Sequence, residues 1–545
     1  MAAMRPLDAL AQNIANARSV PMSGHQSITR DGDFYDNLYT RIGIRPMINC
    51  RGTFTIVSGS TSLPEVKQAM YDASFYYVHL DEMMLAVGAE MGKLTGAEWG
   101  ICTTGASAAT CMATVACIAG TDIEKCEALP TRKKKDQVLI PTKARNPYDI
   151  AVRMSGTELV MFDTVAEMKA KISDRVAMLY LMAGPASTSG PLATSVLAPI
   201  AHEHGIPVFV DAAAEEPNNP NIHIAAGADL VAYSGGKCMR GPQSAGLLIG
   251  NKNLCQAAYY QAAPHHCYGR ALKCSKEETM GMLAALRAWY KRDHAAETKK
   301  WTEWMHYIGE RLKDIPTLKY TVTPPHEDLS NKCPGLRVTW DHDKVGITGT
   351  ELSDRLNAGT PRILLPGRGT RKPVGNAGND DLRTILIQTG KSNTAVTSES
   401  GFSVTSYMLN EGDPEIIAAE VKKVLLNPGT HEAPVVPQGV PANVAGNWDV
   451  TIHYLRGTGQ QHFTLRVDGN KVTGEQKGDY FDSTFTGSIH GNELLLESVL
   501  PVLSWPVHCH FKGTVEGNRI SGPLVLGSGS NFDEYGHVTW EAVRA

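Results

Sequence analysis

Short apolar runs alternate with helix-length segments between residues 61 and 300 of the chain. An apolar run of about four to eight residues is typical of a buried strand, and apolar residues three or four apart predict an amphipathic helix. The segment Asp81–Leu94 repeats Met84, Val87 and Met91 at helical spacing and is followed by Gly96. Strands are predicted at Trp99–Thr103, Val138–Ile140, Leu159–Phe162, Ala177–Met182, Pro207–Val210, Leu230–Tyr233 and Ala245–Ile249.

This alternation predicts an α/β domain with a largely parallel sheet covered by helices on both faces. In such a sheet, ligands bind beyond the carboxyl ends of the strands. The polar residues that directly follow the strands are therefore the first candidates for a functional site.

The pattern changes after the long helical stretch Glu277–Leu312. Strands at Tyr320–Thr323, Gly335–Trp340 and Leu382–Thr389, with helices at Gly349–Leu356 and Asp413–Leu426, predict a smaller α+β domain. The proline-rich segment that follows indicates a linker. We expect an N-terminal arm at 1–45, a large domain at 46–315, the small domain at 316–427, the linker at 428–445 and a further domain at 446–545.

The last hundred residues alternate polar and apolar positions, as strands do. Gly-Asn pairs follow Asp468, His490 and Glu516, and each pair predicts a tight antiparallel hairpin. We expect a small all-β barrel or sandwich that carries no catalytic residues, in which His490, His508 and His510 are ordinary strand residues.

Composition narrows the possible partners. The 545 residues include 52 Lys and Arg against 56 Asp and Glu, a net charge of −4 that gives no support for nucleic acid or an anionic membrane as a partner. The eleven cysteines form no CxxC pair, which indicates free thiols in a reducing compartment and no metal site. No secretory signal or membrane span is recognisable, so we expect a cytoplasmic protein.

Three segments that follow predicted strands carry candidate chemistry. In the first, Cys102-Thr103-Thr104-Gly105-Ala106-Ser107, a glycine turns the chain into a helix rich in Ser and Ala. The N–H groups of such a helix start, with the hydroxyls of Thr104 and Ser107, suit a phosphate. The segment has neither a Walker lysine nor a GxGxxG pattern, so a nucleotide is not expected. A turn selected for packing alone is the alternative interpretation.

The second and third segments supply charged groups. Asp211 follows the apolar run Val208–Val210, where a carboxylate needs a cation or hydrogen-bond donors to offset its desolvation; capping of the next helix is the alternative. Lys237 ends the sequence Ser234-Gly235-Gly236-Lys237. At this edge its pKa can be lowered, which would make the neutral amine available to attack a carbonyl; an ordinary surface lysine is the alternative.

A phosphate cup, an aspartate and a lysine in this order match pyridoxal 5′-phosphate. Lys237 would form the Schiff base, Asp211 would pair with the pyridinium nitrogen, and the helix start would bind the phosphate. The expected cofactor-binding residues are Thr104, Gly105, Ala106, Ser107, Asp211, Ala213, Ser234, Lys237 and, in the segment after a central strand, Tyr148.

Residues 34–427 resemble the fold-type I pyridoxal phosphate enzymes, in the branch of selenocysteine synthase (L-seryl-tRNA selenium transferase) and D-glucosaminate-6-phosphate ammonia-lyase. The resemblance is carried by Pro46–Gly52, Thr104–Ser107, Asp211–Glu215 and Ser234–Lys237. It implies a seven-stranded sheet and a homodimer or larger oligomer with sites near the subunit interface. A basic, tRNA-directed N-terminal region is not evident, so a small amino acid is the expected substrate.

The expected catalytic residues are Lys237, as the base that takes the Cα proton, and Asp211. The resemblance favours β-elimination to a 2-oxo acid and ammonia, a lyase reaction. Racemisation and aldol cleavage use the same cofactor site, and the motifs do not separate them. A protein that keeps the pocket without turnover is an alternative of another class, against which the intact Asp211 and Lys237 argue.

Substrate anchoring calls for an arginine, because the guanidinium binds a carboxylate in a bidentate fork. The candidates are Arg51, Arg362 and Arg368, and His79 and Gln243 are further substrate-binding candidates. For each arginine, a surface or domain-bridging role is the alternative.

Overall fold

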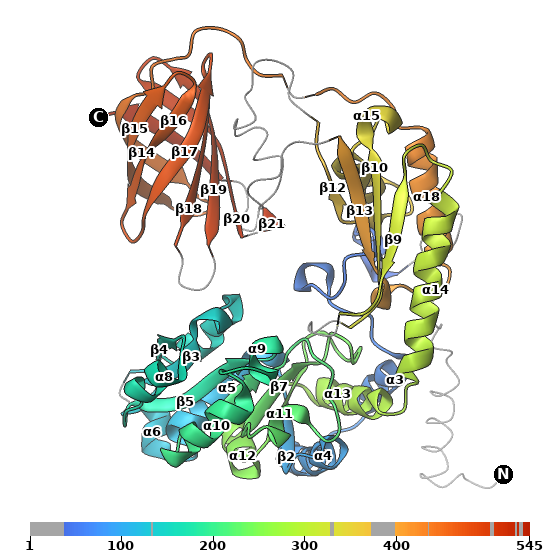
Figure 1. Ribbon diagram of the computed structural model, residues 1–545. Helices are drawn as coiled ribbons and strands as arrows, with labels where there is room; N and C mark the ends of the chain where they lie inside the picture. Colours follow the sequence, from blue (N-terminus) through green and yellow to red (C-terminus); the bar gives the residue numbers. More distant parts are fainter. Residues whose placement is uncertain are drawn as a thin grey trace, which may run out of the picture.

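The computed structural model describes residues 37–131, 134–326, 332–371, 398–433, 435–501, 506–528, 531–532 and 538–545. These residues form a large α/β domain, a smaller α+β domain and a C-terminal β-barrel (Figure 1). The predicted strand Leu382–Thr389 and most of the predicted N-terminal arm lie outside the described residues.

The large domain is built on a seven-stranded sheet with the order β2-β8-β7-β6-β5-β3-β4. Strand β8 is antiparallel to both of its neighbours, and the pairs from β7 to β4 are parallel. Every predicted strand is present and the mainly parallel sheet is confirmed. The strands are β2 (Trp99–Thr103), β3 (Gln137–Pro141), β4 (Glu158–Phe162), β5 (Val176–Met182), β6 (Val208–Asp211), β7 (Leu230–Ser234) and β8 (Gly246–Gly250).

Helix α5 (Gly105–Ala119) is buried along most of its length because it lies across the sheet and contacts β2, β5, β6, β7 and β8. Helix α4 (Leu80–Thr95) buries Met84, Val87 and Met91 against β2, as the spacing predicted. The other helices of this domain are α3 (Pro64–Ser74), α6 (Ile123–Glu127), α7 (Ile150–Arg153), α8 (Val165–Lys171), α9 (Pro185–Thr188), α10 (Thr194–Glu203), α11 (Ile222–Ala225), α12 (Lys252–Gln261) and α13 (Lys276–Trp289).

The long helical stretch predicted at Glu277–Leu312 is two helices, α13 and α14 (His294–Leu312). The chain breaks here because the Asp293 carboxylate accepts a hydrogen bond from the backbone N–H of Ala296, at 3.0 Å, and so begins a new helix. Helix α14 packs in the core of the small domain. The helix break therefore coincides with the passage from one domain to the other.

The small domain has an antiparallel sheet with the order β12-β13-β10-β9. The two-residue strand β1 (Ile48–Asn49) pairs with β11 (Ile363–Leu364), so the segment at the predicted start of the large domain packs in the small-domain core. The sequence pattern missed β13. The elements are β9 (Lys319–Thr323), β10 (Gly335–Asp341), β12 (Gly367–Arg368), β13 (Glu399–Thr405), α15 (His342–Val345), α16 (Gly349–Ala358) and α18 (Asp413–Leu426).

The C-terminal domain is a closed antiparallel barrel, because β19, the first strand of its order, pairs with β20, the last strand before the two-residue β21. Gly469, Gly491 and Gly517 have φ angles of 58°, 55° and 60° and open the two-residue turns, as the Gly-Asn pairs predicted. The strands are β14 (Gly446–His453), β15 (Thr458–Asp468), β16 (Lys471–Gly478), β17 (Asp482–His490), β18 (Glu493–Leu500), β19 (Val507–Glu516), β20 (Arg519–Ser528), β21 (Asn531–Phe532) and β22 (Val538–Arg544).

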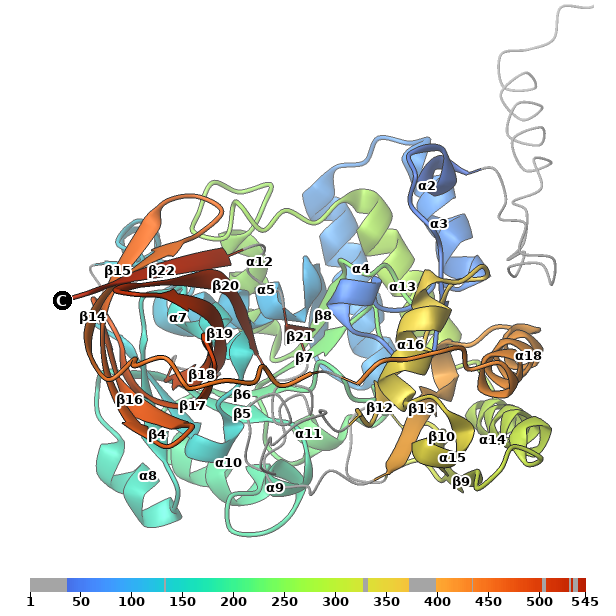
Figure 2. The ribbon, with the colours of Figure 1, turned by 90° about the horizontal axis from the view of Figure 1, so that it is seen from above.

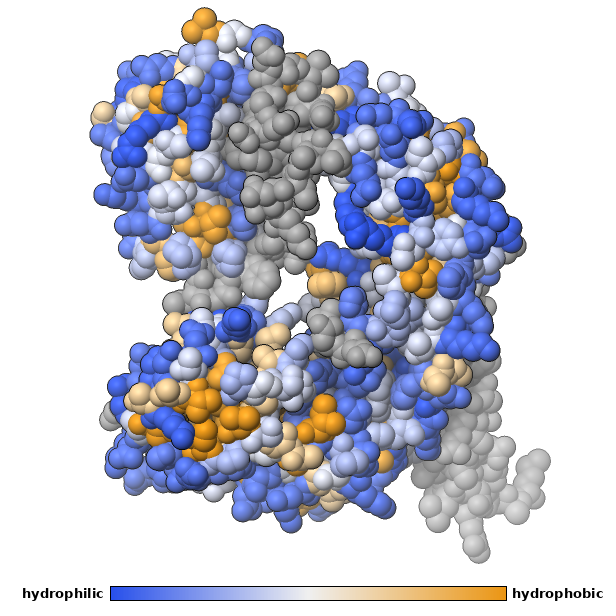
Figure 3. Space-filling model, viewed as in Figure 1, coloured by the Kyte–Doolittle hydropathy of each residue, from blue (hydrophilic) through white to orange (hydrophobic). Residues whose placement is uncertain are grey.

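The barrel stands over the β3–β4 side of the large domain and the small domain over the α3–α13 side (Figures 1 and 2). On the face shown in Figure 3, apolar residues gather on the large domain, whereas the barrel and the small domain are mainly hydrophilic. Among the described residues, none of the helices has the length and apolar character needed to cross a bilayer.

Candidate functional site

The three predicted segments meet at one edge of the large-domain sheet. Gly246, at the start of β8, pairs with Thr103 on one side and with Ser234 on the other. On the next strands Asp211 pairs with Ala232. Strands β2, β7 and β6 therefore end at the same edge of the sheet, with β8 between β2 and β7. The distance from β2 to β6 across the sheet is about three strand spacings, or ~14 Å.

The backbone before Lys237 passes too close to its neighbours for any residue except glycine. A Cβ on Gly235 would lie 2.6 Å from Met282 Sδ, and a Cβ on Gly236 would lie 2.7 Å from the Cα of Gln243. Gln243 thus contacts the lysine loop through its backbone, and its side chain is exposed. The two glycines hold Lys237 at a fixed place on the sheet edge.

Asp211 lies at the end of β6 with both carboxylate oxygens hydrogen-bonded. Oδ2 accepts from the hydroxyl of Tyr180 at 2.8 Å, and Oδ1 accepts from the backbone N–H of Ala213 at 3.1 Å. The Tyr180 hydroxyl in turn accepts from Asn146 Nδ2 at 3.3 Å. Burial raises the pKa of Asp211, and these hydrogen bonds, together with the charge of Lys237, act in the opposite direction.

Lys237 and Asp211 interact electrostatically. Burial lowers the pKa of the Lys237 ammonium, and the charge of Asp211 raises it. The two residues on which the sequence hypothesis depended therefore face the same space. A buried amine with a lowered pKa is the form of lysine that reacts with carbonyl groups.

The start of α5 has free donors of the kind that bind anions. Gly105 has a φ of +80°, and no side chain caps the helix at Thr104. The Thr104 hydroxyl donates to the carbonyl of Leu272 at 3.0 Å, so its proton is not available to a phosphate, and the donors at this turn are the backbone N–H groups. The first N–H groups of a helix have no partner within it, which suits a phosphate.

A cavity of about 450 Å³ lies where the large and small domains meet, and Lys237 reaches it. Arg51 and Tyr148, two further predicted residues, also line it. The lining comprises Arg51, Gly52, Thr53, Phe54, Thr55, Tyr148, Lys237, Thr323, His326, Cys333, Pro334, Gly335, Leu336, Arg337, Ser403, Val404, Thr405 and Tyr407.

Four of the predicted substrate-binding residues do not line this cavity. Arg362 donates through Nε to Asn357 Oδ1 at 2.8 Å, His79 is exposed before α4, and Gln243 is exposed beside the lysine loop. Arg368 does not line the cavity, but burial and the nearby charge of Arg337 lower its pKa, which puts it close to the cavity wall.

Residues missed by the sequence analysis come from two sources. Tyr180 is hidden in the apolar strand Val176–Met182, where its hydroxyl was the single polar signal. Arg337 and Tyr407 come from the small domain, far along the chain from Lys237. Arg337 occupies an exposed position of β10, and the Tyr407 hydroxyl lies 2.6 Å from Thr53 Oγ1.

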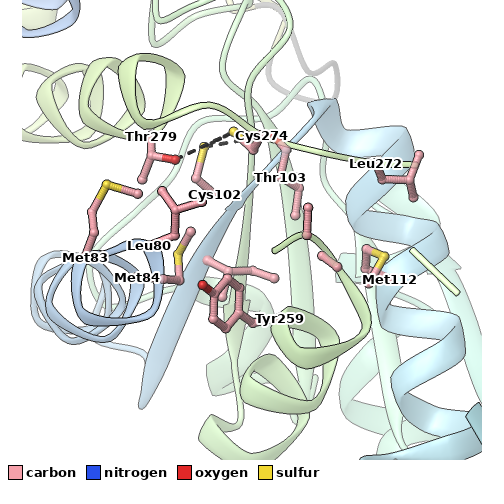
Figure 4. A pocket seen from close by; sticks show the side chains of 13 residues that line it. Leu80, Met83, Met84, Cys102, Thr103, Met112, Tyr259, Leu272, Cys274 and Thr279 are labelled. Carbon is pink, nitrogen blue, oxygen red and sulfur yellow. Dashed lines mark hydrogen bonds between the residues drawn. The ribbon is translucent and has the colours of Figure 1, made fainter. Parts of the chain in front are cut away.

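A second cavity, of about 20 Å³, lies behind β2 and is mainly apolar (Figure 4). Cys102 and Cys274 meet beside it with their sulfur atoms 3.4 Å apart. This space is close to the size of one water molecule and cannot hold a cofactor. The sulfur pair is nevertheless near the start of α5, since Cys102 precedes Thr103 and Thr104.

The residues at the sheet edge fit pyridoxal phosphate. Asp211 is a partly buried carboxylate whose raised pKa would fall beside a pyridinium N–H, Lys237 is a partly buried amine, and α5 offers uncapped N–H groups. The cofactor would thus rest on Asp211, Lys237 and the Thr104–Ser107 turn, with Ala213 and Ser234 next to them on the same edge.

Comparison with known proteins supports this fit. The aminotransferase class-V family model matches residues 152–333. The chain is 28% identical over 343 residues to a 5′-C-glycyluridine monooxygenase-decarboxylase of a Streptomyces species, covering 60% of this chain and 83% of the relative. It is 26% identical over 334 residues to the D-glucosaminate-6-phosphate ammonia lyase of Salmonella typhimurium, covering 59% and 87%.

An L-seryl-tRNA(Sec) selenium transferase of Aquifex aeolicus is 28% identical over 200 residues, which are 31% of this chain and 41% of the relative. A solved structure of a D-glucosaminate-6-phosphate ammonia-lyase superposes with a TM-score of 0.58 at 23% identity, covering 72% of this chain and 99% of that one. The chain therefore carries a fold-type I pyridoxal phosphate domain of the aminotransferase class-V type, and the ammonia lyase and the selenium transferase are its homologues.

Proposed function

We propose that the protein is a pyridoxal phosphate-dependent lyase that removes a β-substituent from a small amino acid and releases a 2-oxo acid and ammonia. The observation that carries the proposal is that Lys237 and Asp211 lie close enough at one sheet edge for each charge to shift the pKa of the other, and that Lys237 also lines the cavity between the two domains. The homology to an ammonia lyase supports the reaction type.

Pyridoxal phosphate supplies an aldehyde that condenses with amines and a protonated ring that withdraws electrons from the substrate Cα. The Lys237 amine would be bonded to the aldehyde carbon, and the substrate amine would replace it there. The freed Lys237 amine, with a lowered pKa, would then take the Cα proton. Loss of this proton would let the Cβ–X bond break with both electrons leaving on the substituent, and hydrolysis of the released enamine would give the 2-oxo acid and ammonia.

Asp211 acts on the ring nitrogen. Its carboxylate is held in place by Tyr180 and by the N–H of Ala213, so it would accept from the ring N–H without reorganising. Burial strengthens that charge–charge contact, since the effective dielectric constant is low. The free Thr104–Ser107 turn would bind the phosphate and fix the ring in register with both residues.

Substrate recognition is proposed to rest on Arg51 and Arg337, which both line the cavity and both lie next to residues of the small-domain core. The Arg51 backbone N–H donates to Asn49 Oδ1 at 2.9 Å, which fixes the loop that carries it. A guanidinium at this place suits a carboxylate. Arg337→Ala is expected to raise KM for an anionic substrate about tenfold or more with a smaller change in kcat, since a charged hydrogen bond contributes about 1.5–3 kcal/mol.

We further propose a cytoplasmic homodimer. All eleven cysteines are free thiols, which is typical of a reducing compartment. Phe54, Ile56 and Tyr77 are 49%, 77% and 102% exposed, and Phe54 also lines the cavity, so a second subunit that covers Phe54 would help to enclose the site. Light scattering of wild type and of a Tyr77→Glu, Ile56→Glu variant would test this, with a monomeric wild type contradicting it.

Racemisation, aldol cleavage and oxidative decarboxylation are the rival reactions, the last because one relative is named a monooxygenase-decarboxylase. A screen of D- and L-amino acids with β-substituents would measure 2-oxo acid, ammonia, oxygen uptake and carbon dioxide. Stoichiometric 2-oxo acid and ammonia without oxygen uptake are expected. Product that requires oxygen, or inversion without ammonia, would refute the lyase proposal.

The role of Lys237 is tested separately from the reaction. Borohydride reduction of the loaded chain is expected to fix the coenzyme to the peptide that contains Lys237, as read by mass spectrometry. Lys237→Ala should abolish both the adduct and turnover. Lys252→Ala changes an exposed lysine at the start of α12 and should alter neither. Turnover in Lys237→Ala would refute the role given to Lys237. No coenzyme uptake by wild type would refute the cofactor site itself, and with it the alternative of a non-catalytic pocket.

A further inference from the structure

Three possible metal ligands converge on the outer face of the barrel. His508 and His510 lie on β19, and Glu497 lies on β18 directly opposite His510. The residues between and beside the histidines, Cys509 and Phe511, are buried in the barrel core. Because side chains alternate along a strand, His508 and His510 share the opposite, outer face. The sequence analysis treated both as ordinary strand residues, since a His-x-His spacing alone does not show what the neighbouring strand contributes.

The spacing of the ligand atoms suits one small cation. One atom of each of the three residues lies within 4.8 Å of the other two. The distance between His508 Nδ1 and Glu497 Oε1 is 3.3 Å. Two ligand atoms at about 2.0–2.1 Å from a tetrahedral zinc ion are about 3.3–3.4 Å apart. This pair is thus already at the separation that a metal requires, and rotation of the remaining imidazole would complete the set.

The chemistry of the set favours zinc. Two imidazoles and one carboxylate are ligands that Zn²⁺ accepts in tetrahedral sites with an open fourth position. Other histidine–carboxylate contacts on this barrel have one imidazole only: His462 Nδ1 lies 3.0 Å from Asp449 Oδ1, and His453 Nε2 lies 3.2 Å from Glu541 Oε1. Within the part of the chain that the structure describes, the three residues of β18 and β19 are the one His, Cys, Asp and Glu group with metal-binding spacing.

We propose that Glu497, His508 and His510 bind one divalent zinc ion, with a water molecule or a further donor in the fourth position. The ion would join β18 to β19. A cation that binds the folded barrel and not the unfolded chain stabilises the folded state by mass action. Zinc would therefore raise the melting temperature of the barrel. The site is separate from the sheet edge of the large domain, so its occupancy does not depend on the proposed enzyme function.

The test uses the untagged full-length chain, stripped with a chelator and titrated with zinc chloride in competition with a chromophoric chelator. One zinc ion per chain is expected. Removal of a ligand in Glu497→Gln, His508→Gln or His510→Gln should weaken binding more than tenfold, since even changes beyond the ligands cost 10–100-fold. His462→Gln, a matched imidazole on the same barrel with one carboxylate partner, should bind as wild type.

Cobalt(II) provides a second readout that needs no variant. Intense visible absorption of the cobalt-loaded wild-type chain, typical of four-coordinate geometry, would support the site, and circular dichroism would show that each variant is folded. Zinc stoichiometry that is unchanged in all three ligand variants, or lost equally in His462→Gln, would overturn the proposal. So would weak six-coordinate cobalt spectra together with no protein-bound zinc.

Discussion

Replacing Tyr180 by phenylalanine tests whether the buried network under the sheet edge controls the charge of Asp211. The substitution removes one hydroxyl, which donates to Asp211 Oδ2 at 2.8 Å and accepts from Asn146 Nδ2 at 3.3 Å. A hydrogen bond to a charged group contributes about 1.5–3 kcal/mol. At about 1.36 kcal/mol per pKa unit, its loss should raise the pKa of Asp211 by a further one to two units.

The sign of the stability change follows from the direction of that pKa. Burial holds the pKa of Asp211 in the folded chain above its value in the unfolded chain. Stability therefore falls as the pH rises through the interval between the two values. Tyr180→Phe extends the interval upward, so its stability deficit against wild type should be small below about pH 4 and grow to about 1.5–3 kcal/mol above the folded-state pKa.

The assay is urea unfolding of the cofactor-free chain from pH 4 to 8, followed by turnover of the loaded enzyme. Tyr233→Phe is the matched control: Tyr233 is equally buried on β7, which is separated from β5 by β6, and its hydroxyl accepts from Asn221 Nδ2 at 2.7 Å. Its deficit should not change with pH. A roughly 10- to 100-fold fall in kcat/KM is expected for Tyr180→Phe, as 1.36 kcal/mol is tenfold in rate. Equal, pH-independent deficits in both variants would refute the reasoning.

Two further predictions concern groups near the site. Burial raises the pKa of Glu297, but hydrogen bonds from His294 and the bidentate Arg292 outweigh it and lower the pKa to about 2. The ionised Glu297 should stabilise the fold above about pH 4.5, and this contribution should be lost as the pH falls toward 2. Glu297→Gln should therefore lower the free energy of unfolding by about 2 kcal/mol at pH 7, after allowance for partial exposure, and by less at pH 4, as measured by urea unfolding. Hydrogen bonding from Cys102 lowers the pKa of the Cys274 thiol, against its burial, whereas hydrogen bonding to Cys274 and burial raise that of Cys102. Iodoacetamide should label Cys274 before Cys102, and Cys102→Ala should slow the labelling of Cys274. Mass spectrometry of the labelled peptides measures both rates, and faster labelling of Cys102 than of Cys274 would contradict the prediction.

The fold was largely predictable because each strand of the large domain is a short, almost uninterrupted apolar run. Buried parallel strands leave that signature in the sequence. Strand β13 was missed because Glu399–Thr405 alternates weakly and contains a glycine. The break between α13 and α14 was missed for another reason: no glycine or proline marks it in the sequence, and the interruption comes from capping by Asp293.

At the site, what could be predicted were the residues that follow strands. Asp211 and Lys237 stand out because charge is rare at the end of an apolar run, and the glycines before Lys237 mark a close backbone approach. Tyr180 could not be singled out, because a phenol within a strand is more often core than ligand. Its role depends on a register between β5 and β6 that pairs Met182 with Asp211.

The substrate-facing wall of the cavity was beyond sequence reasoning for a topological reason. Lys237 and Asp211 come from or directly after neighbouring strands, whereas Arg51, Arg337 and Tyr407 come from segments that lie at least 100 residues along the chain from either of them. These relatives are 26–28% identical to this chain over the matched residues, yet their names describe an ammonia lyase, a monooxygenase-decarboxylase and a selenium transferase. If the sheet edge supplies the common chemistry, the reaction must be selected by what the second domain presents to the substrate. Arg337→Ala should therefore change which amino acids are accepted, and Lys237→Ala should abolish reaction with all of them.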